Sequence, residues 1–581
     1  MDKLNQILKE LNPQQKQAVE HFNGPAVVLA GAGSGKTRVL ITRVFNLVYK
    51  HKIDPSAIML VTFTNKAAKE MTERLGDVKV GFVGTFHSFC VRVLRIWGSK
   101  IGLNKNFVIY DDDDQVALMK KILKSLNLGK TFSPRYYLSI ISMAKNNNFE
   151  LEDYIYQNYS SFIADKIYQV CQAYEKEKQA NSAVDFDDLL LLAVKLLSTN
   201  RQVLESLQKR FSYVLIDEFQ DTNTVQYELA RLICFSHNNL FVVGDFSQSI
   251  YSWRGAQIQN LKKIQKDFPN TKEYRLEINY RSTQQILNYA YEVISQNTTH
   301  PVLHLKTEFK GDYDVEIKGF ADEEQESIFV AETILQLNDL NRFKDFAILF
   351  RTNAQSRYLE ETLIRYNLPY RLTGGVRFYE RKEIKDILSY LRLVVNPKDS
   401  VSLDRALKIG KRRYNKFEKL LKEEQDLTEL PTPDIIAKIL QATDYLDLYN
   451  DKVEEDLSRL ENIKELRSIA YEFPNLNEFL EHIALVESEY FEGEKKTTNG
   501  VQLMTLHQAK GLEFSVVFIV GVEDGLLPHS RSLDDQQALE EERRLFYVGI
   551  TRAMERLFIT YAQTRKIYGR RNFSVVSRFL L

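Results

Sequence analysis

The chain has 581 residues, of which 44% are hydrophobic, and its 78 basic side chains (Lys and Arg) are balanced by 78 acidic ones (Asp and Glu). This composition is typical of soluble globular proteins and argues against a disordered chain. No apolar run approaches the roughly 18 residues that a membrane span needs, and the three cysteines show neither CxxC nor metal-ligand spacing. We therefore expect a cytoplasmic protein with no membrane partner, divided into several folding units because one core rarely exceeds about 250 residues.

Short apolar runs alternate with helical patterns in the N-terminal half of the chain. The first run, 27–30, leads into the glycine-rich residues 31–35 and then into a helical pattern. Strands that alternate with helices in this way predict a parallel sheet with helices on both faces. The expected strands are 27–30, 58–62, 213–216 and 240–243, and the expected helices are 36–49 and 66–75.

Residues 30–37 match the phosphate-binding loop pattern except at the first position, where Ala30 stands in place of Gly. In such a loop, backbone N–H groups at a helix N-terminus surround the phosphates of a nucleotide. Lys36 then neutralises the β- and γ-phosphates, and the Thr37 hydroxyl binds Mg²⁺. A flexible glycine-rich turn is the alternative, and it does not account for Gly-Lys-Thr between a strand and a helix. The expected ATP-binding residues of the loop are Ala30, Gly31, Ala32, Gly33, Ser34, Gly35, Lys36 and Thr37.

Two carboxylates, Asp217 and Glu218, follow the apolar run at 213–216. In a phosphate-loop ATPase the aspartate of such a pair holds Mg²⁺, while the glutamate orients and deprotonates the attacking water. A solvated strand end is the alternative for the pair alone, and the phosphate loop in the same chain favours catalysis. Hydrolysis also needs positive charge at the γ-phosphate, for which Arg281 and Arg552 are candidates that the residues alone do not single out.

An aromatic and basic group lies at residues 251–254. Tyr251, Trp253 and Arg254 put two rings and a cation together, which suits stacking with the bases of a single strand of any sequence. Residues 63–66 directly follow the expected strand 58–62, at the end of a parallel strand where ligands bind. Core packing is the alternative for an isolated ring. The expected strand-contacting residues of these two segments are Phe63, Thr64, Asn65, Lys66, Tyr251, Trp253 and Arg254.

A second α/β pattern occupies the C-terminal half, with expected strands at 346–350, 501–505, 516–520 and 557–561. Two long stretches, about 101–180 and 380–498, have helical patterns without strand runs. We therefore expect an α/β protein with two parallel-sheet cores, each interrupted by a helical insertion. The expected boundaries are 1–100 and 181–275 for the first core, 101–180 for its insertion, 276–379 and 499–581 for the second core, and 380–498 for its insertion.

Ten motifs follow one another along the chain: GAGSGKTRVL, VTFTNKAAKEM, GTFHSF, DFDDLL, LIDEFQDTN, VGDFSQSIYSWRGA, NYRS, FRTNAQSR, LMTLHQAKGLEF and LEEERRLFYVGITRA. Their residues and order resemble the UvrD/Rep/PcrA group of superfamily 1 DNA helicases over nearly the whole chain. The resemblance implies two RecA-like motor domains that bind ATP between them, with ATP and Mg²⁺ as cofactors. It also implies single-stranded DNA and single-strand/duplex junctions as partners, and a monomer or a weak, DNA-induced dimer; protein partners stay unknown.

The resemblance assigns nucleotide roles to residues in the matching motifs. Gln15 would read the adenine edge, and Tyr280 would stack on the adenine ring. Arg38 and Glu513 would make further nucleotide contacts. Gln248 would sense the γ-phosphate and couple hydrolysis to the strand site.

The resemblance also assigns two arginine fingers and two further strand contacts. Arg281 and Arg552 would reach the γ-phosphate from the second core, and His507 and His529 would line the second core's part of the DNA groove. The expected catalytic set is therefore Lys36, Asp217, Glu218, Gln248, Arg281 and Arg552.

The second helical stretch departs from the family pattern. It is shorter than in relatives, and residues 411–415, Lys-Arg-Arg-Tyr-Asn, stand where relatives have a glycine-containing turn. Such a turn can seat duplex phosphates on its backbone N–H groups, so we expect the duplex contacts to differ here. The basic run at 408–413 could replace them electrostatically, and a solvated helix face is the alternative.

Together these features predict an ATP-dependent 3′→5′ DNA helicase or translocase that couples ATP hydrolysis to movement on single-stranded DNA and to duplex unwinding, in DNA repair or replication. The direction comes from the resemblance alone. A translocase that displaces proteins without efficient unwinding is the alternative within this class. A nucleic-acid binder with a decayed ATPase is disfavoured by the intact Lys36, Asp217 and Glu218. A P-loop nucleotide kinase or GTPase is disfavoured by the paired cores and by the rings at 251 and 253.

Overall fold

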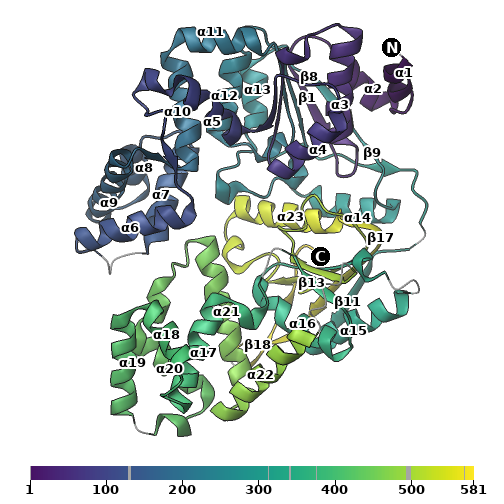
Figure 1. The fold of residues 1–581 in the computed structure, drawn as a ribbon. Helices are drawn as coiled ribbons and strands as arrows, with labels where there is room; N and C mark the ends of the chain where they lie inside the picture. The colour runs from purple at the N-terminus through teal and green to yellow at the C-terminus, as the bar shows by residue number, and fades with distance from the viewer. Residues whose placement is uncertain are drawn as a thin grey trace. The chain divides into compact units, whose positions relative to one another are not determined.

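The computed structural model describes residues 2–128, 133–311, 313–338, 342–373, 376–424, 426–492, 499–567 and 570–581. The chain divides into two compact units, Met1–Lys310 and Gly311–Leu581, and each has its own large sheet (Figure 1). Residues 276–310, which we assigned to the second core, lie in the first unit, and the predicted domain boundaries stay predictions. No helix within the described ranges is both long enough and apolar enough to cross a membrane.

The sheet of the first unit has six strands in the order β3-β2-β6-β7-β1-β8, and every pairing is parallel. The four central strands are buried along their whole length, as their continuous apolar runs predict. The strands are β1 (Ala26–Ala30), β2 (Ile58–Thr62), β3 (Phe82–Thr85), β6 (Tyr213–Ile216), β7 (Leu240–Gly244) and β8 (Lys272–Leu276).

Helices cover both faces of this sheet, because alternate residues of each strand point to opposite faces. Val27 and Leu29 of β1 belong to the core formed with α5, α10 and α12, whereas Val28 belongs to the core formed with α2, α3 and α4. The helices are α2 (Pro13–Glu20), α3 (Lys36–Phe45), α4 (Asn65–Leu75), α5 (Phe86–Trp97), α10 (Phe186–Thr199), α11 (Arg201–Arg210), α12 (Thr224–Cys234) and α13 (Asn260–Asp267). A further helix of this unit, α14 (Gln284–Ile294), follows the sheet in sequence.

Four helices between β3 and β6 form a group with its own hydrophobic core, the α6–α9 bundle (Figure 1). Met119, Ile140, Ile167 and Tyr174 lie in that core. The stretch is helical as predicted, except that β4 (Val108–Ile109) pairs with β5 (Ala183–Val184), a two-residue contact too short to leave a sequence pattern. The helices are α6 (Asp112–Ser125), α7 (Pro134–Asn146), α8 (Leu151–Asn158) and α9 (Ser161–Ala180).

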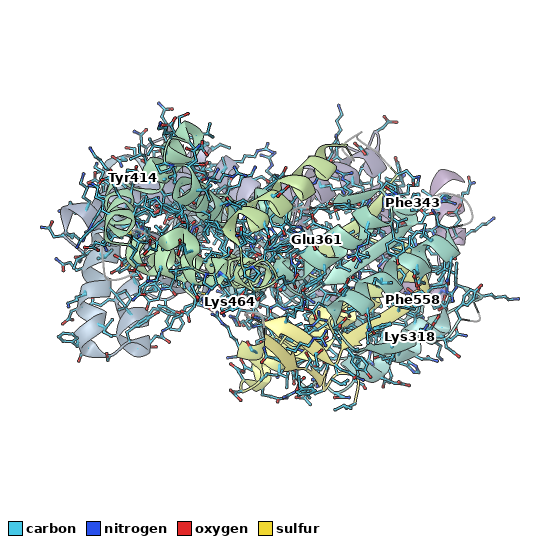
Figure 2. All side chains as sticks on the ribbon, turned by 90° about the horizontal axis from the view of Figure 1, so that it is seen from below. Lys318, Phe343, Glu361, Tyr414, Lys464 and Phe558 are labelled. Carbon is cyan, nitrogen blue, oxygen red and sulfur yellow. The ribbon has the colours of Figure 1, made fainter. Side chains whose placement is uncertain are left out.

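The second unit repeats the architecture with a six-stranded parallel sheet in the order β11-β17-β15-β12-β14-β13. Lys318 and Phe558 lie on its neighbouring strands β11 and β17 (Figure 2). Its strands are β11 (Glu316–Phe320), β12 (Phe346–Phe350), β13 (Tyr370–Leu372), β14 (Val501–Thr505), β15 (Phe514–Ile519) and β17 (Ala553–Ala562), and the helices α15 (Glu323–Leu337), α16 (Ser356–Arg365) and α23 (Gln536–Ile550) accompany them.

A second helical group lies between β13 and β14 in sequence and also has its own core, which includes Ile387, Phe417 and Ile469. Tyr414 and Lys464 mark its helices α19 and α21 in Figure 2. Residues 411–415 lie in the first part of α19, which begins directly after Gly410, the residue that joins it to α18. The helices are α17 (Lys382–Val395), α18 (Ser400–Ile409), α19 (Lys411–Glu423), α20 (Thr432–Thr443), α21 (Glu454–Ala470) and α22 (Leu476–Glu492). Two parallel-sheet cores, each with an inserted helical group, confirm the predicted fold class.

Candidate nucleotide site and nucleic-acid interface

The predicted site residues of the first unit gather at one edge of its sheet. Parallel strands end at the same edge, and in open α/β sheets ligands bind there. The glycine loop follows β1, residues 63–66 follow β2, Asp217 and Glu218 follow β6, Gln248 lies four residues beyond β7, and Tyr280 and Arg281 follow β8 and β9 (Ile278–Asn279). The sheet topology therefore brings together segments that lie up to 250 residues apart in sequence.

The glycine loop is held in a conformation that its glycines require. Gly33 and Gly35 have φ angles of +62° and +83°, in the left-handed region that favours glycine. A Cβ atom at Gly33 would lie 2.8 Å from the Cβ of Arg281, and one at Gly35 would lie 2.9 Å from Nε2 of Gln15. Ala30, the departure from the pattern, is the last residue of β1 and has ordinary strand geometry, so no glycine is needed there.

Gln15 lies directly against the glycine loop. It forms a capping box with Asn12 at the start of α2, and its Nε2 donates to the carbonyl of Ser34 at 2.9 Å. Asn12 in turn donates from Nδ2 to the hydroxyl of Tyr280 at 2.8 Å. Gln15 and Tyr280, the two expected adenine contacts, thus lie on the same side of the loop, and their adenine roles stay predictions. The Arg38 guanidinium pairs with Glu10 on the exposed side of α3.

Asn279 joins the glycine loop to the segment that carries Tyr280 and Arg281. Its Nδ2 donates to the Ala32 carbonyl at 2.7 Å, and its Oδ1 accepts from the backbone N–H groups of Arg281 and Ser282 at 2.7 and 2.8 Å. The Tyr280 N–H donates to the Gly33 carbonyl at 3.0 Å, and the Tyr280 ring is 54% exposed. The NYRS motif contains Asn279, but its contact with Ala32, 247 residues away in sequence, forms only in the fold, so the residues alone do not single it out.

The two carboxylates after β6 are closely constrained. The Glu218 N–H donates to Oδ1 of Asp217 at 3.0 Å, and Glu218 has a φ angle of +48°. A left-handed conformation at a residue other than glycine is rare and is found at functional sites. Burial and the neighbouring Glu218 carboxylate raise the pKa of Asp217 to about 7, and the Lys36 ammonium opposes the rise.

Gln220 links the Asp217–Glu218 segment to the end of β7. Its Nε2 donates to Glu218 at 2.5 Å, and its Oε1 accepts from the Asp245 N–H at 3.0 Å. Gln248 donates from Nε2 to Oδ2 of Asp245 at 2.7 Å. A chain of hydrogen bonds therefore runs from Glu218 through Gln220 and Asp245 to Gln248. Gln220 is fully buried, and only the quoted LIDEFQDTN motif could have pointed to it.

The donor set fits a hard divalent cation. Asp217 and Asp245 are buried carboxylates, and burial raises the pKa of Asp245 above its ordinary value while Lys36 opposes the shift. The Thr37 hydroxyl lies in the first turn of α3 at the same edge. Oxygen ligands of this kind suit Mg²⁺, and a cation beside them would offset the repulsion that the Glu218 carboxylate exerts on both.

The rings expected to contact a nucleic-acid strand lie together, and we call Phe63, Tyr251, Trp253 and Arg254 the aromatic platform. The Phe63 and Tyr251 rings are stacked, with centroids 5.6 Å apart and planes 11° apart. Trp253 meets Tyr251 edge-on at 6.4 Å, and the Arg254 guanidinium lies 4.5 Å from the Trp253 ring. Trp253 is 45% exposed, so it is not a core residue.

Residues 64–66 lie at the start of α4, next to the platform. Thr64 caps the helix by accepting from the Ala67 N–H at 3.1 Å, and Asn65 and Lys66 are exposed in its first turn. The N-terminus of a helix attracts phosphate groups, so this segment suits a strand backbone.

Phe186 is a further exposed ring that the sequence analysis missed. It is 46% exposed at the start of α10 and meets the His87 ring edge-on at 5.7 Å. The signal in the sequence was the position of Phe186 within the DFDDLL motif. That position alone did not indicate an exposed ring, because core packing accounts for most phenylalanines.

The predicted residues of the second unit lie at two different edges of its sheet. Glu513 directly precedes β15, and Arg552 directly precedes β17; the Arg552 guanidinium donates to the carbonyls of Val548 and Leu512 at 2.9 and 3.1 Å. His507 follows the carboxyl end of the parallel strand β14, at the opposite edge. The nucleotide roles of Glu513 and Arg552 and the strand role of His507 stay predictions.

His529 is buried rather than open on a groove. Its Nε2 lies 2.9 Å from Glu461 of α21, and its backbone N–H donates to Glu542 of α23 at 3.0 Å. These contacts join the core of the second unit to its helical group. The predicted DNA contact of His529 stays a prediction, and its surroundings also give it a structural role.

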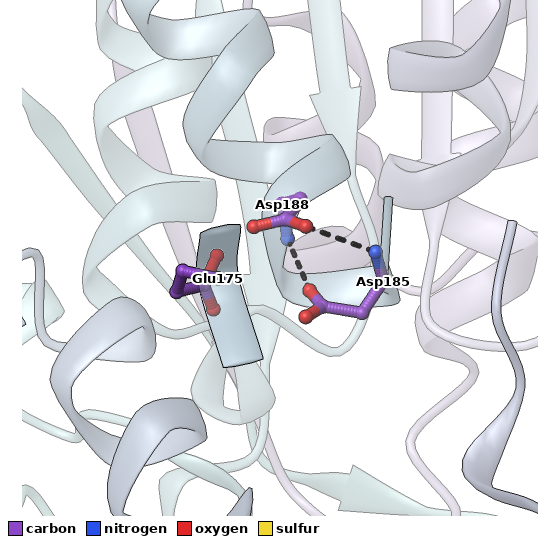
Figure 3. Close-up of side chains that lie close together, drawn as sticks. All are labelled: Glu175, Asp185 and Asp188. Atoms are coloured by element: carbon purple, nitrogen blue, oxygen red, sulfur yellow. Dashed lines mark hydrogen bonds between the residues drawn. The ribbon is translucent and has the colours of Figure 1, made fainter. Parts of the chain in front are cut away.

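A second acidic cluster consists of Glu175 on α9 and of Asp185 and Asp188 at the start of α10 (Figure 3). Lys145 and Lys178 pair with these carboxylates at 2.6 to 3.0 Å. The two ammonium groups balance most of the negative charge, so the cluster is a buried ion-pair network and does not need a metal.

A glycine loop on a parallel sheet, with carboxylates and an aromatic platform at the same edge, defines a P-loop nucleotide-binding protein with the features of a nucleic-acid motor. The family model described as the UvrD/REP helicase N-terminal domain matches residues 11–269, and that of the UvrD-like helicase C-terminal domain matches residues 274–564. The chain therefore belongs to the UvrD-like helicase family.

Named relatives extend this likeness over the whole chain. The ATP-dependent DNA helicase PcrA of Bacillus subtilis is 40% identical, over 99% of this chain and 86% of that protein. The PcrA proteins of Staphylococcus epidermidis and Staphylococcus aureus are 39% identical, over 99% of this chain and 87% and 86% of theirs. The alignment to the Bacillus protein is 640 residues long, more than the 581 of this chain, so that protein has stretches without a counterpart here.

Proposed function

We propose that this protein is an ATP-dependent DNA helicase that moves 3′→5′ along single-stranded DNA and unwinds duplex at single-strand/duplex junctions, in DNA repair or replication. The observation that carries the proposal is the common edge of the first sheet, where the nucleotide-site residues and the aromatic platform lie on neighbouring loops. The direction and the biological role rest on likeness to the family. We expect a monomer or a weak, DNA-induced dimer.

The nucleotide chemistry would follow from the residues at that edge. The backbone of residues 31–35 and the Lys36 ammonium would bind the phosphates, and Thr37 and Asp217 would hold Mg²⁺. When bound, Mg²⁺ neutralises charge on the β- and γ-phosphate oxygens. Glu218 takes the proton of the attacking water, whose oxygen bonds to the γ-phosphorus as the bond to the β-phosphate oxygen breaks, and ADP and phosphate leave.

Three further groups would act on the transferring phosphate. Gln248 donates a hydrogen bond to it, and Arg281 and Arg552 supply positive charge where negative charge develops. Gln248 is only three residues from Tyr251, so a shift of the short segment 245–254 on ATP binding or hydrolysis would reach the platform directly.

The platform would hold the strand in a way that tolerates any sequence. Bases stack on the Phe63–Tyr251 pair and on Trp253, and the α4 N-terminus with Lys66 receives backbone phosphates. Phe186 offers another exposed ring for stacking. A grip without base-specific hydrogen bonds is what a motor needs to move step by step.

The test is ATP hydrolysis with and without single-stranded DNA, for the wild type, Lys36→Ala and the surface control Lys209→Ala on α11. We expect strong stimulation by the strand in the wild type and the control, and loss of hydrolysis in Lys36→Ala. Strand displacement is then measured on duplexes with 3′ or 5′ tails, and unwinding of the 3′-tailed substrate alone is expected.

Each alternative has its own outcome in these assays. No stimulation by the strand would contradict the motor, and unwinding of the 5′-tailed substrate alone would contradict the direction. Stimulated hydrolysis without displacement of either substrate would favour a translocase that removes proteins from DNA.

A further inference from the structure

The C-terminal end of α7 contacts two segments of the first unit. The carboxylate segment, residues 217–223, begins with Asp217 and Glu218, and the platform segment, residues 251–257, carries Tyr251, Trp253 and Arg254. Asn146, the last residue of α7, is 7% exposed. Its Oδ1 accepts from Nδ2 of Asn223 at 2.5 Å, and its Nδ2 donates to Oδ1 of Asp187 at 3.1 Å and to the Ser142 carbonyl at 2.9 Å. A buried amide whose oxygen and nitrogen both have partners holds its neighbours in fixed positions, because any shift leaves a polar group unsatisfied.

The Asn223 contact leads to the catalytic carboxylates. Asn223 ends the segment that begins with Asp217 and Glu218, and its side chain caps α12 by accepting from the Gln226 N–H at 2.8 Å. Asn260 of α13 donates to the carbonyls of Thr222 and Asn223 at 2.9 and 3.1 Å. The far end of the carboxylate segment is therefore held in place, and Asn146 is one of the groups that hold it.

The same helix end also contacts the aromatic platform. Gly255, which directly follows Arg254, has a φ angle of +84°, and a Cβ atom there would lie 2.8 Å from the Cβ of Asn146. Asn147 accepts from Nε2 of Gln257 at 3.0 Å, while the Gln257 backbone N–H donates to the Thr222 carbonyl at 2.9 Å. The platform segment and the carboxylate segment thus touch each other where both touch α7.

Ion pairs to the three carboxylates drawn in Figure 3 hold this helix end in place. Lys145, next to Asn146, pairs with Glu175, Asp185 and Asp188 at 2.7 to 2.9 Å. Lys178 of α9 pairs with the same carboxylates. Breaking a buried network of this kind leaves unpaired charge, so α7 and α9 stay fixed against the start of α10.

We propose that Asn146 is a positioning residue for strand-stimulated ATP hydrolysis: it holds the platform segment at Gly255 against Asn223, so that strand binding at the platform is transmitted to the carboxylates. The proposal rests on the proposed function. It gives the α6–α9 bundle a part in the motor, because the bundle supplies the side chain at which the two segments meet.

The test compares Asn146→Ala with Asn158→Ala. Asn158 is a matched control, because its Nδ2 also donates to the carbonyl four residues earlier, that of Tyr154 at 2.8 Å, but it is exposed at the end of α8. For each variant the ATPase rate is measured without DNA and across a titration of single-stranded DNA. We expect Asn146→Ala to lower the ratio of stimulated to basal rate at least fivefold, with the KM for ATP within twofold of wild type, and Asn158→Ala to match the wild type.

A donor–acceptor exchange supplies the rescue. In Asn146→Asp with Asp187→Asn, the amide and the carboxylate change places across their 3.1 Å contact, and the new carboxylate still accepts from Asn223. The Ser142 carbonyl loses its donor equally in Asn146→Asp and in the double variant, so comparing the two isolates the contact with residue 187. We expect this double variant to recover more of the stimulation ratio than Asn146→Asp alone. Thermal unfolding of each variant shows whether it folds. If Asn146→Ala does not fold, the comparison of the double variant with Asn146→Asp remains as the test.

Three results would overturn the proposal: a wild-type stimulation ratio in Asn146→Ala, an equal loss of basal and stimulated rates, or no recovery in the exchange variant. A wild-type protein that single-stranded DNA does not stimulate would contradict the proposed function instead, so the two failures are distinguishable.

Discussion

Asn279 offers a direct test of how the glycine loop is held for ATP. It is 1% exposed, and its side chain makes three hydrogen bonds, one to the Ala32 carbonyl and two from the N–H groups of Arg281 and Ser282. In Asn279→Ala all three are lost, and of the contacts described above between the loop and the segment that carries Tyr280 and Arg281 only the backbone bond from the Tyr280 N–H to the Gly33 carbonyl is left. Both segments belong to the expected nucleotide site, so the loss should appear in ATP binding.

The magnitude follows from the hydrogen bonds. Each is worth about 1 kcal/mol net, so the link contributes roughly 2–3 kcal/mol to the ordering of this edge. If ATP binding must restore about half of that order, the lost 1–1.5 kcal/mol corresponds to a KM for ATP about 5- to 15-fold higher. Asn279→Asp should raise KM further, because its carboxylate would face the Ala32 carbonyl and the phosphates.

The measurement is the ATP dependence of hydrolysis at saturating single-stranded DNA, with Asn288→Ala as the control. Asn288 lies in the same region, on α14, and is exposed with a single hydrogen bond from Gln284. A wild-type KM in Asn279→Ala, or a lower KM in Asn279→Asp than in Asn279→Ala, would refute the reasoning. Thermal unfolding above the assay temperature excludes global unfolding as the cause.

Three further predictions concern the platform and the second unit. Trp253→Ala should raise the DNA concentration for half-maximal ATPase stimulation about tenfold, since a stacked base is worth roughly 1–3 kcal/mol, and Trp253→Phe should not; equal values in both would show that the ring does not stack. Burial raises the pKa of Glu360 from 4.5 to about 7, so the folded state holds a proton that the unfolded state releases, and stability falls as pH rises between these values. The loss is about 3 kcal/mol, and urea unfolding at pH 5 and 7.5 should show a smaller pH effect in Glu360→Gln. Arg357→Met should destabilise the second unit by about 3–5 kcal/mol in urea unfolding, because Glu361 and Glu465 lose a buried partner, and an unchanged midpoint would contradict this.

The central strands could be predicted from the sequence, and the edge strands could not. The expected strands at 58–62, 213–216, 346–350 and 501–505 match β2, β6, β12 and β14 in both bounds. These strands are buried on both faces, so they appear as continuous apolar runs. The edge strand β8 reads Lys-Glu-Tyr-Arg-Leu with four of its five residues partly or fully exposed, and only its pairing with β1 makes it a strand.

The site could be predicted where a residue type carries the chemistry by itself. Lys36 and Asp217 are recognisable because a phosphate loop and a strand-end carboxylate have local patterns. Gln220, Asn223 and Asn279 were missed because an amide has no chemistry of its own in hydrolysis. Their importance lies in partners that the fold alone brings near.

On the proposed function, these amides would couple two events at one edge of the sheet: ATP hydrolysis and a shift of the strand site. A catalytic group that moved freely would respond to ATP without moving the strand site. Here Gln220 ties Glu218 to Asp245, Asp245 accepts from Gln248, and the platform begins three residues later at Tyr251. A change at the γ-phosphate must therefore either break buried hydrogen bonds or move the whole segment, and breaking a buried bond costs about 1–3 kcal/mol. On the proposed function, moving the segment would be the cheaper response, and these amide contacts would carry a change at the γ-phosphate to the rings of the aromatic platform.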